Sequence, residues 1–522
     1  MEFNTPFANI YVYVASLTCT ALIYRWLTNR KERALPHPPG PKGLPFIGNL
    51  LQMPSSRIWE KASQWGEEFG DIVYVENLGK PMLFLNSYDD AVELLANRSA
   101  LYSSRPHSTM SMDLEGWDWM MINIPYGDTL RKHRAYHHRF ISNPDILNYL
   151  DVQASETRKM LCHMLDAPEE YEKHIARLPG AISMLNVYGH RVEKNDRYIE
   201  LGMTSIRYAS EAAGERYFFL DLLPWLKHIP ECIPFVDFPR VAKAARKVSH
   251  AVLFDLYELT KKRVAEGNAM ESMTTIFLSE NTKDDGIVED EEDFCAAAAT
   301  FFTGGVDTTV TAIMSFVLAM LKNPEAQRLA QLEIDRVVGN DRLPTFEDKE
   351  NLPYVQALCE EVLRFATITP FTLPHLTTAD DVYKGYSIPA GTVVFANIWE
   401  LCKNPEFHDD PAAFRPERWL SLWNEDTKGE DANGRRPRNY AFGFGRRICT
   451  GQKWAEHLLF IAAASMLAAF NIEKAVDEDG KPIAPNEDYL QSFVRTLGPS
   501  RCKITPRSLK MASLVRLSVE DD

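Results

Sequence analysis

The sequence predicts one large, mainly helical domain with a small β-rich lobe, preceded by an N-terminal transmembrane helix. Three observations carry this fold class. Helical patterns fill residues 150–290, 291–321 and 454–470, whereas strand patterns are confined to 71–86 and 383–397. No linker or low-complexity stretch divides the body of the chain, so one domain is expected despite its length of 522 residues.

The composition excludes several classes of protein. Hydrophobic residues make up 45% and charged residues 25% of the chain, which is ordinary for a globular protein. The net charge of −15 argues against a nucleic-acid partner. The 8 cysteines are scattered without a CxxC pair, so neither a zinc ribbon nor a disulfide scaffold is supported and a reducing, cytosol-facing location fits.

The N-terminus predicts a membrane anchor. Residues 3–24 carry no charge, and basic residues follow at once between 25 and 33, which places the N-terminus in the lumen and the body of the protein in the cytosol. A cleaved signal peptide is the weaker alternative, because no Lys or Arg precedes the apolar run. We therefore expect an anchor at 1–28, a basic and proline-rich hinge at 29–45, and the folded domain at 46–522; the hinge is equally consistent with an ordinary linker.

The chain is organised around the loop at 442–451, Phe-Gly-Phe-Gly-Arg-Arg-Ile-Cys-Thr-Gly, which leads into the helix at 454–470. Glycines permit tight turns, and Cys449 precedes a helix N-terminus, where the helix dipole favours a thiolate. A buried structural cysteine is the competing interpretation. It does not explain why arginines, glycines and a phenylalanine surround one thiol.

This loop resembles the haem-binding signature of the cytochrome P450 (haem-thiolate) family at five positions, Phe442, Gly445, Arg447, Cys449 and Gly451. The resemblance implies the cytochrome P450 fold, with residues 46–522 as a haem-thiolate catalytic domain. It also implies that haem b (iron protoporphyrin IX) is the cofactor, that the matching residues hold it, and that Cys449 is the axial ligand of its iron. A thiolate ligand favours cleavage of the O–O bond.

The apolar helix at 291–321 contains Gly304-Gly305-Val306-Asp307-Thr308-Thr309. It is long enough to span a membrane, but an aspartate at mid-span disfavours that alternative. The two glycines weaken a helix and invite a local kink. The cluster resembles the acid–threonine motif of the same family, which implies that Thr308 and Asp307 are catalytic and deliver protons for O–O cleavage. This match favours a true monooxygenase.

Glu361 and Arg364 lie three residues apart on a helix, and Arg418 follows in a Pro-x-Arg segment. By the resemblance, these three form a buried charge triad that holds the cysteine loop under the haem. Their role is structural, and loss of one member leaves a buried charge without a partner.

Two positions at the expected haem edge match the family and two depart from it. Arg134 and His375 match contacts to the haem propionates. Leu130 stands where tryptophan is usual, and Leu376 stands where arginine is usual. These departures indicate either weakened or rearranged polar contacts.

Surface features are expected on the helix near Arg134. His133 and His137 have metal-pair spacing, but no third ligand accompanies them, so a solvated basic face is favoured. Four cations, Arg131, Lys132, Arg139 and Lys453, are a candidate docking patch for a redox partner.

Three further segments have alternative interpretations. Residues 103–123 are rich in Met and Trp, which suits either a substrate-pocket wall or an ordinary core. Residues 220–238 suit a membrane contact, a substrate entrance or a packed loop. Residues 493–495 match a turn that enters the pocket in the family, and the tail after Pro506 is expected at the surface.

Together these features predict a single-pass endoplasmic reticulum monooxygenase that hydroxylates an apolar small molecule. Electrons come from NADPH through a separate cytochrome P450 reductase, with cytochrome b5 as a second candidate donor. The segment 383–389 is similar to fungal members of the family, which suggests secondary metabolism such as terpenoid biosynthesis. The alternatives are a haem-thiolate isomerase or peroxygenase, and a non-catalytic haem-binding membrane protein.

Overall fold

The computed structural model describes residues 35–143, 146–193, 196–213, 217–423, 436–490, 493–498 and 500–520. The predicted anchor at 1–28 lies outside these residues, as does the first part of the predicted hinge.

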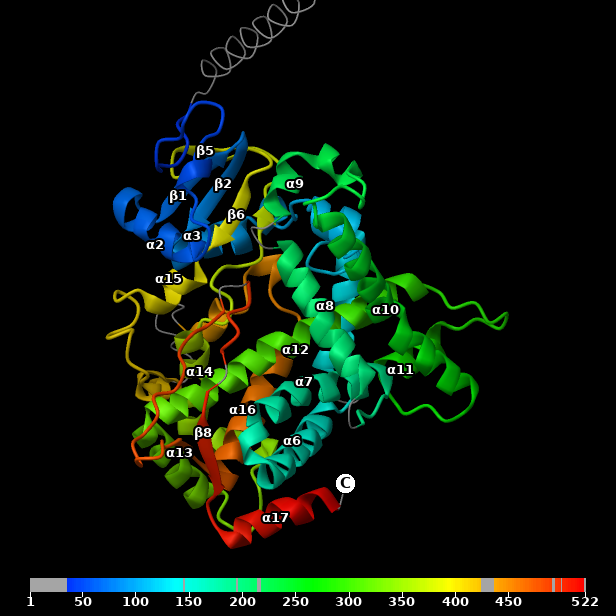
Figure 1. The fold of residues 1–522 in the computed structure, drawn as a ribbon, viewed down its shortest axis with the longest axis vertical. Helices are drawn as coiled ribbons and strands as arrows, with labels where there is room; N and C mark the ends of the chain where they lie inside the picture. Colours follow the sequence, from blue (N-terminus) through cyan, green and yellow to red (C-terminus); the bar gives the residue numbers. More distant parts are fainter. Residues whose placement is uncertain are drawn as a thin grey trace, which may run out of the picture.

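Helices make up most of the described chain (Figure 1). The helices of the body are α5 (Asp128–Ser142), α6 (Tyr149–Asp166), α7 (Tyr171–Tyr188), α8 (Arg197–Ala213), α10 (Phe238–Ala265), α11 (Met273–Asn281), α12 (Glu291–Lys322), α13 (Pro324–Val337), α14 (Pro353–Ala366) and α16 (Gln452–Ala469). Shorter helices are α2 (Ile58–Phe69), α3 (Tyr88–Ala91), α4 (Ser99–Tyr102), α9 (Phe218–Leu222) and α15 (Ile398–Lys403), and α17 (Leu509–Glu520) ends the chain.

Helix α12 forms the centre of the helical body and packs against α5, α7, α14 and α16 (Figure 1). Among the described residues it is the one helix long and apolar enough to cross a membrane. Its apolar stretch is 72% buried inside the protein, so it is the core helix that the central aspartate indicates. The helix is continuous from Glu291 to Lys322, and the two glycines do not end it.

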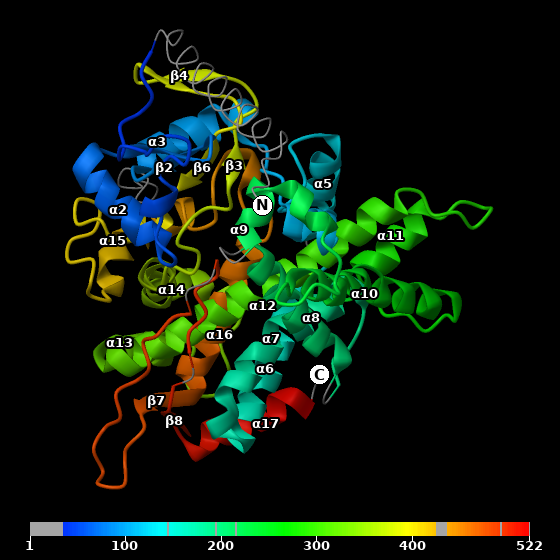
Figure 2. The same ribbon diagram turned by 45° about the horizontal axis from the view of Figure 1, so that its top comes forward.

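The β-rich lobe lies beside the helical body (Figures 1 and 2). Its main sheet has four strands in the order β1-β2-β6-β3. Its four strands are β1 (Ile72–Asn77), β2 (Lys80–Leu85), β6 (Val393–Ala396) and β3 (His375–Leu376). Two further pairs form separate two-stranded sheets, namely β4 (Asp381–Tyr383) with β5 (Tyr386–Ile388), and β7 (Phe470–Lys474) with β8 (Cys502–Pro506). The strand predictions for 71–86 and 383–397 are therefore confirmed.

The backbone conformation of two turn residues explains the β1–β2 hairpin. Leu78 and Gly79 both have positive φ, 49° and 79°, which gives the two-residue turn whose twist suits antiparallel strands. β2 then pairs in parallel with β6, and β3 pairs antiparallel with β6. This sheet places His375, at the start of β3, where the lobe meets the helical body.

Helix α17 differs from the predicted surface tail. It packs against α6 and α16 and buries Met511 and Val515, which are 5% and 0% exposed. The apolar spacing of four residues gives the helix one buried face, so the expectation that the whole tail lies at the surface is wrong.

Candidate active site

One cavity of about 390 Å³ lies between the cysteine loop and the glycine-containing part of α12. Cys449, Asp307 and Thr308 all line it, although they come from distant parts of the chain. The loop before β3 and the segment from Trp117 to Ile122 close its sides. The two motifs that the sequence singled out therefore face the same space.

The cysteine loop depends on its glycines for shape. Gly443 and Gly445 have φ values of 79° and 54°, which lie in the left-handed region. A Cβ atom on Gly445 would also overlap the carbonyl oxygen of Leu95, in the π-helical turn η2 (Val92–Asn97). The backbone N–H of Cys449 donates to the carbonyl of Phe442 at 2.8 Å, which closes the loop.

The Cys449 thiol is accessible through the cavity that it lines. Burial by the surrounding protein raises the pKa of the thiol, while the backbone N–H of Gly451 and the charge of Arg134 act in the opposite direction. The lowered thiol pKa expected from the helix terminus is therefore wrong for the protein by itself, because burial dominates. Metal coordination would deprotonate the thiol in any case.

Three guanidinium groups gather beside the cavity, and all three donate to backbone carbonyls. Arg134 donates to Ile448 at 2.8 Å. Arg447 donates to Ser103 and Ile124 at 2.6 Å each, and to Met121 at 3.2 Å. Arg105 donates to Ile122, Leu373 and Pro374 at 2.7–3.0 Å.

We call Arg105, Arg134 and Arg447 the cationic cluster. No carboxylate pairs with any of them within the described part of the chain. Burial lowers the pKa of all three groups, and it lowers that of Arg447 to about 10. Because a desolvated charge without a counter-charge is unfavourable, an anion in the cavity would stabilise the cluster.

The cationic cluster fits iron protoporphyrin IX, because this cofactor carries two carboxylates on one edge. His375 lines the same cavity and donates through Nδ1 to the carbonyl of Tyr102 at 2.7 Å. Burial and the neighbouring charge of Arg105 keep the pKa of His375 well below its usual value, so the ring is neutral at pH 7.

Arg105 was missed by the sequence reasoning. It lies between the Ser103-Ser104 pair and Pro106, with no motif recognised around it, and its role depends on carbonyls more than 260 residues away. Leu130 lies in the cavity wall as an apolar residue, and Leu376 forms strand β3. Arg105 thus supplies a third cation where those two positions supply none.

The middle of α12 presents polar groups and open space to the cavity. The hydroxyl of Thr308 donates to the carbonyl of Gly304 at 3.1 Å. A Cβ atom on Gly304 would meet nothing within 4 Å, so the missing side chain leaves room beside the helix. Burial raises the pKa of Asp307, and a hydrogen bond from Thr496 opposes the rise.

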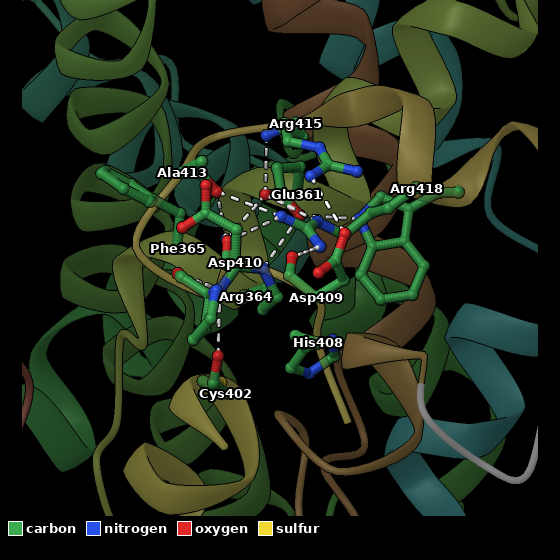
Figure 3. Close-up of polar contacts among 12 residues, drawn as sticks. Glu361, Arg364, Phe365, Cys402, His408, Asp409, Asp410, Ala413, Arg415 and Arg418 are labelled. Atoms are coloured by element: carbon green, nitrogen blue, oxygen red, sulfur yellow. Dashed lines mark hydrogen bonds and ion pairs between the residues drawn. The ribbon is translucent and has the colours of Figure 1, made fainter. Parts of the chain in front are cut away.

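Glu361, Arg364 and Arg418 lie together in the protein interior (Figure 3). Arg364 makes two contacts with the Glu361 carboxylate, at 2.7 and 3.0 Å, and both side chains are 0% exposed. Arg418 donates to the same carboxylate at 3.1 Å, and the indole of Trp419 donates at 2.8 Å. Both oxygens of this carboxylate thus accept hydrogen bonds, which compensates for burying its charge.

The hydrogen bonds of this triad end on the segment from Cys402 to Trp419, rather than on the cysteine loop itself (Figure 3). The connection to the loop is indirect. The ring of His408 lies 3.2 Å from the hydroxyl of Tyr440, which is two residues before Phe442. The triad therefore fixes the scaffold on which the loop rests.

The predicted solvated face of α5 is wrong for both histidines. His133 and His137 are each 1% exposed. His137 donates through Nε2 to the carbonyl of Ala297 and accepts through Nδ1 from Thr450, both at 2.8 Å. Burial lowers the pKa of His137 to about 4. This ring joins α5, α12 and the cysteine loop.

Three of the four cations in the candidate docking patch already have acidic partners. Arg131 pairs with Asp128, Arg139 pairs with Glu280, and Lys132 pairs with Asp290 and Asp293. Lys453 is exposed. The patch is thus a mixed-charge surface, which weakens its assignment as a basic docking site.

The segment predictions have mixed outcomes. Trp117, Met120 and Met121 line the cavity, as do Phe493 and Val494. In residues 220–238, several apolar side chains face outward, including Trp225 at 66% and Phe235 at 104% exposed. That segment is therefore not simply a packed loop.

Comparison with known proteins agrees with this site. The sequence model of the family described as Cytochrome P450 matches residues 38–501. The chain is 35% identical to Cytochrome P450 monooxygenase COX2 of Coprinopsis cinerea, over 97% of this chain and 96% of the relative. It is 37% identical to Cytochrome P450 monooxygenase ple1 of Rhodocybe pseudopiperita, over 94% and 93%, and 35% identical to Cytochrome P450 monooxygenase claR of Ampulloclitocybe clavipes, over 93% and 89%.

Proposed function

Because this chain belongs to the cytochrome P450 family and is a haem-dependent monooxygenase, we propose that it hydroxylates an apolar small molecule at the cavity described above. The observation that carries the proposal is that Cys449 and the pair Asp307–Thr308 line the same cavity. Cys449 supplies a ligand for iron, and Asp307 and Thr308 supply groups that hold and transfer protons.

In this proposal, the Cys449 thiolate would bind the iron of haem b, and the cationic cluster with His375 would hold the propionates. Phe442, Gly445 and Gly451 shape the loop around the ligand. When bound, thiolate-ligated haem supplies the activation of O₂ for insertion of one oxygen atom into a C–H bond.

Asp307 and Thr308 deliver protons to the cavity. The raised pKa of the partly buried Asp307 carboxyl makes it a better proton donor near neutral pH. The Thr308 hydroxyl is within 3.1 Å of the Gly304 carbonyl, and its oxygen is the atom through which a proton passes from the acid side toward the open space at Gly304.

The cavity wall supports an uncharged, apolar substrate. Ile206 of α8, Phe301 of α12 and Phe493 of the segment before β8 line it, and Asp307 is the one acidic side chain among the described lining residues. The fungal origin of the relatives supports a role in fungal secondary metabolism, such as terpenoid biosynthesis.

Membrane attachment in the endoplasmic reticulum, with the catalytic domain in the cytosol, belongs to the same proposal. The uncharged run at 3–24 supports a single-pass anchor. The exposed apolar side chains Trp225, Ile233 and Phe235 support a second contact with the bilayer. An NADPH–cytochrome P450 reductase supplies the electrons, with cytochrome b5 as a further donor.

The test is a reconstitution with reductase, NADPH and a panel of terpenoid, polyketide and indole compounds. A low-to-high-spin shift of the haem spectrum identifies a bound compound, and reductase-dependent hydroxylation of that compound is expected. In Asp307→Asn and Thr308→Ala, substrate binding should persist while coupling of NADPH to product falls about 10- to 100-fold. Turnover without reductase and O₂ would instead indicate an isomerase or peroxygenase.

A further inference from the structure

A carboxyl group that the proposed chemistry does not use lies behind the cavity wall. Glu115 is 0% exposed, and no cation pairs with it within the described part of the chain. Burial raises the pKa of this carboxyl to about 8, and the negative charge of Glu211 on α8 adds to the rise. The Glu115 carboxyl is therefore mostly protonated at pH 7. No ion pair fixes the position of its side chain within the described part of the chain.

The single side-chain partner of this carboxyl, among the described residues, is an indole of the cavity wall. Oε2 of Glu115 accepts from Nε1 of Trp117 at 2.7 Å, whereas Oε1 has no hydrogen-bond partner among these residues. Trp117 is 0% exposed and lines the cavity. One buried hydrogen bond thus connects a group outside the cavity to a ring that bounds it.

The backbone around Trp117 is held by other groups. The side chain of Asn123 donates to the carbonyl of Trp117 at 2.8 Å. Arg105 and Arg447 donate to carbonyls within residues 121–124. Ser249 also donates to the carbonyl of Gly116 at 2.6 Å. Because these contacts fix the main chain, the direction of the indole ring depends on its hydrogen bond to Glu115 and on its packing against the Trp119 ring, whose centroid lies 5.9 Å away.

We propose that Glu115 is a positioning residue for substrate selection, and that its hydrogen bond keeps the Trp117 ring against the wall so that the cavity admits a bulky group. The proposal rests on the proposed function, because it concerns what binds beside the haem. Without the bond, the indole N–H is buried without an acceptor and turns toward the hydroxyl groups of the cavity, where the ring occupies substrate space.

Two iron-binding probes of different size test this directly. Imidazole needs little space, whereas 4-phenylimidazole places a phenyl ring in the cavity, and the haem spectrum reports binding of each. Glu115→Leu keeps the side-chain volume but removes the acceptor, and it should weaken 4-phenylimidazole relative to imidazole about tenfold. Glu115→Gln keeps an oxygen acceptor and should leave the ratio of dissociation constants within about twofold of the original.

Glu333→Leu is the matched control, because it makes the same substitution at a second buried carboxyl. Glu333 is 9% exposed and accepts from the backbone N–H groups of Tyr354 and Val355 at 2.9 and 3.0 Å, and none of these residues lines the cavity. Thermal stability should fall while the probe ratio stays unchanged. In a Trp117→Phe background, which has no N–H to hold, adding Glu115→Leu should change the ratio no further.

An unchanged ratio in Glu115→Leu overturns the proposal, as does an equal change in Glu333→Leu. If Glu115→Leu gives no folded holoprotein, Glu115→Asp carries the same test, because the shorter side chain cannot reach the indole. Failure of the original protein to bind either probe through haem would contradict the proposed function instead, so the two failures are distinguishable.

Discussion

Gly445 occupies a position where a side chain has no room. Its φ of 54° is unfavourable for residues with a Cβ atom, and a Cβ atom there would overlap the carbonyl oxygen of Leu95. We expect Gly445→Ala to destabilise the protein by more than about 2 kcal/mol and to abolish haem incorporation, measured by the reduced-CO difference spectrum. Gly443→Ala is the control. It has a φ of 79° but no backbone closer than 3.8 Å, so it should lose only about 1 kcal/mol and keep its haem.

A substitution of Arg105 should affect the stability of the apoprotein and the retention of haem differently. Arg105→Met removes a buried charge that lacks a carboxylate partner but also removes three hydrogen bonds to backbone carbonyls. Because these effects oppose one another, the stability of the apoprotein should change by less than about 1 kcal/mol. The holoprotein should lose haem at least about tenfold faster, because one propionate contact is gone. Haem transfer to an apoglobin measures this rate. Arg446→Gln, at an exposed arginine of the cysteine loop bonded to Tyr126, should change neither quantity; equal loss in both variants would contradict the role of Arg105.

The predicted site residues that lie together in the structure belong to contiguous motifs. Cys449 and the pair Asp307–Thr308 each carry their chemistry in a short local pattern, and the structure brings them to one cavity. Arg105 and Glu115 were missed because their environments come from segments remote in sequence or from burial alone. A lone arginine or glutamate in a loop is usually solvated, so sequence chemistry gave no reason to select either.

At the scale of elements, α14 joins the body to the segment that precedes the cysteine loop. Glu361→Gln leaves Arg364 and Arg418 buried without a full counter-charge. We expect a loss of about 3–5 kcal/mol in urea unfolding and little holoprotein. Glu360→Gln on the same helix is the control, because its partners Arg436 and Arg438 are 20% and 33% exposed, and it should lose about 1 kcal/mol. Comparable losses would show that the triad has no special role.

Element types followed from periodicity, but the faces of α5 did not. Its histidines and arginines suggested a solvated basic surface, yet α12 covers His133 and His137, and acids near the start of α12 neutralise Lys132. The period of α5 identifies one polar side. Only the packing of a second helix determines whether that side meets water, and such packing is not encoded within α5.

At the scale of the whole molecule, buried neutral histidines predict sensitivity to acid. Burial lowers the pKa of His137 to about 4 and that of His375 well below its usual value. The unfolded chain binds protons at these rings near pH 6.5 and the folded protein does not, so stability is complete above about pH 6.5 and falls as the pH approaches 4. His137 alone accounts for about 3 kcal/mol of this loss.

Urea unfolding at a series of pH values between 7 and 4 measures the effect. His137→Gln should be less stable at pH 7 but should show a shallower fall in the free energy of unfolding. His138→Gln, at the exposed neighbour on α5, should keep the original slope. An unchanged slope in His137→Gln would mean that this ring is already protonated in the folded protein.

If the cationic cluster holds the propionates as proposed, the polypeptide would select its prosthetic group by charge as well as by shape. An esterified porphyrin has the same ring and the same iron but brings no negative edge, and it would leave the three guanidiniums without a counter-charge. Under the proposed assignment, the molecule that neutralises the cluster is also the molecule that brings the iron, so ionic pairing would select the prosthetic group during maturation.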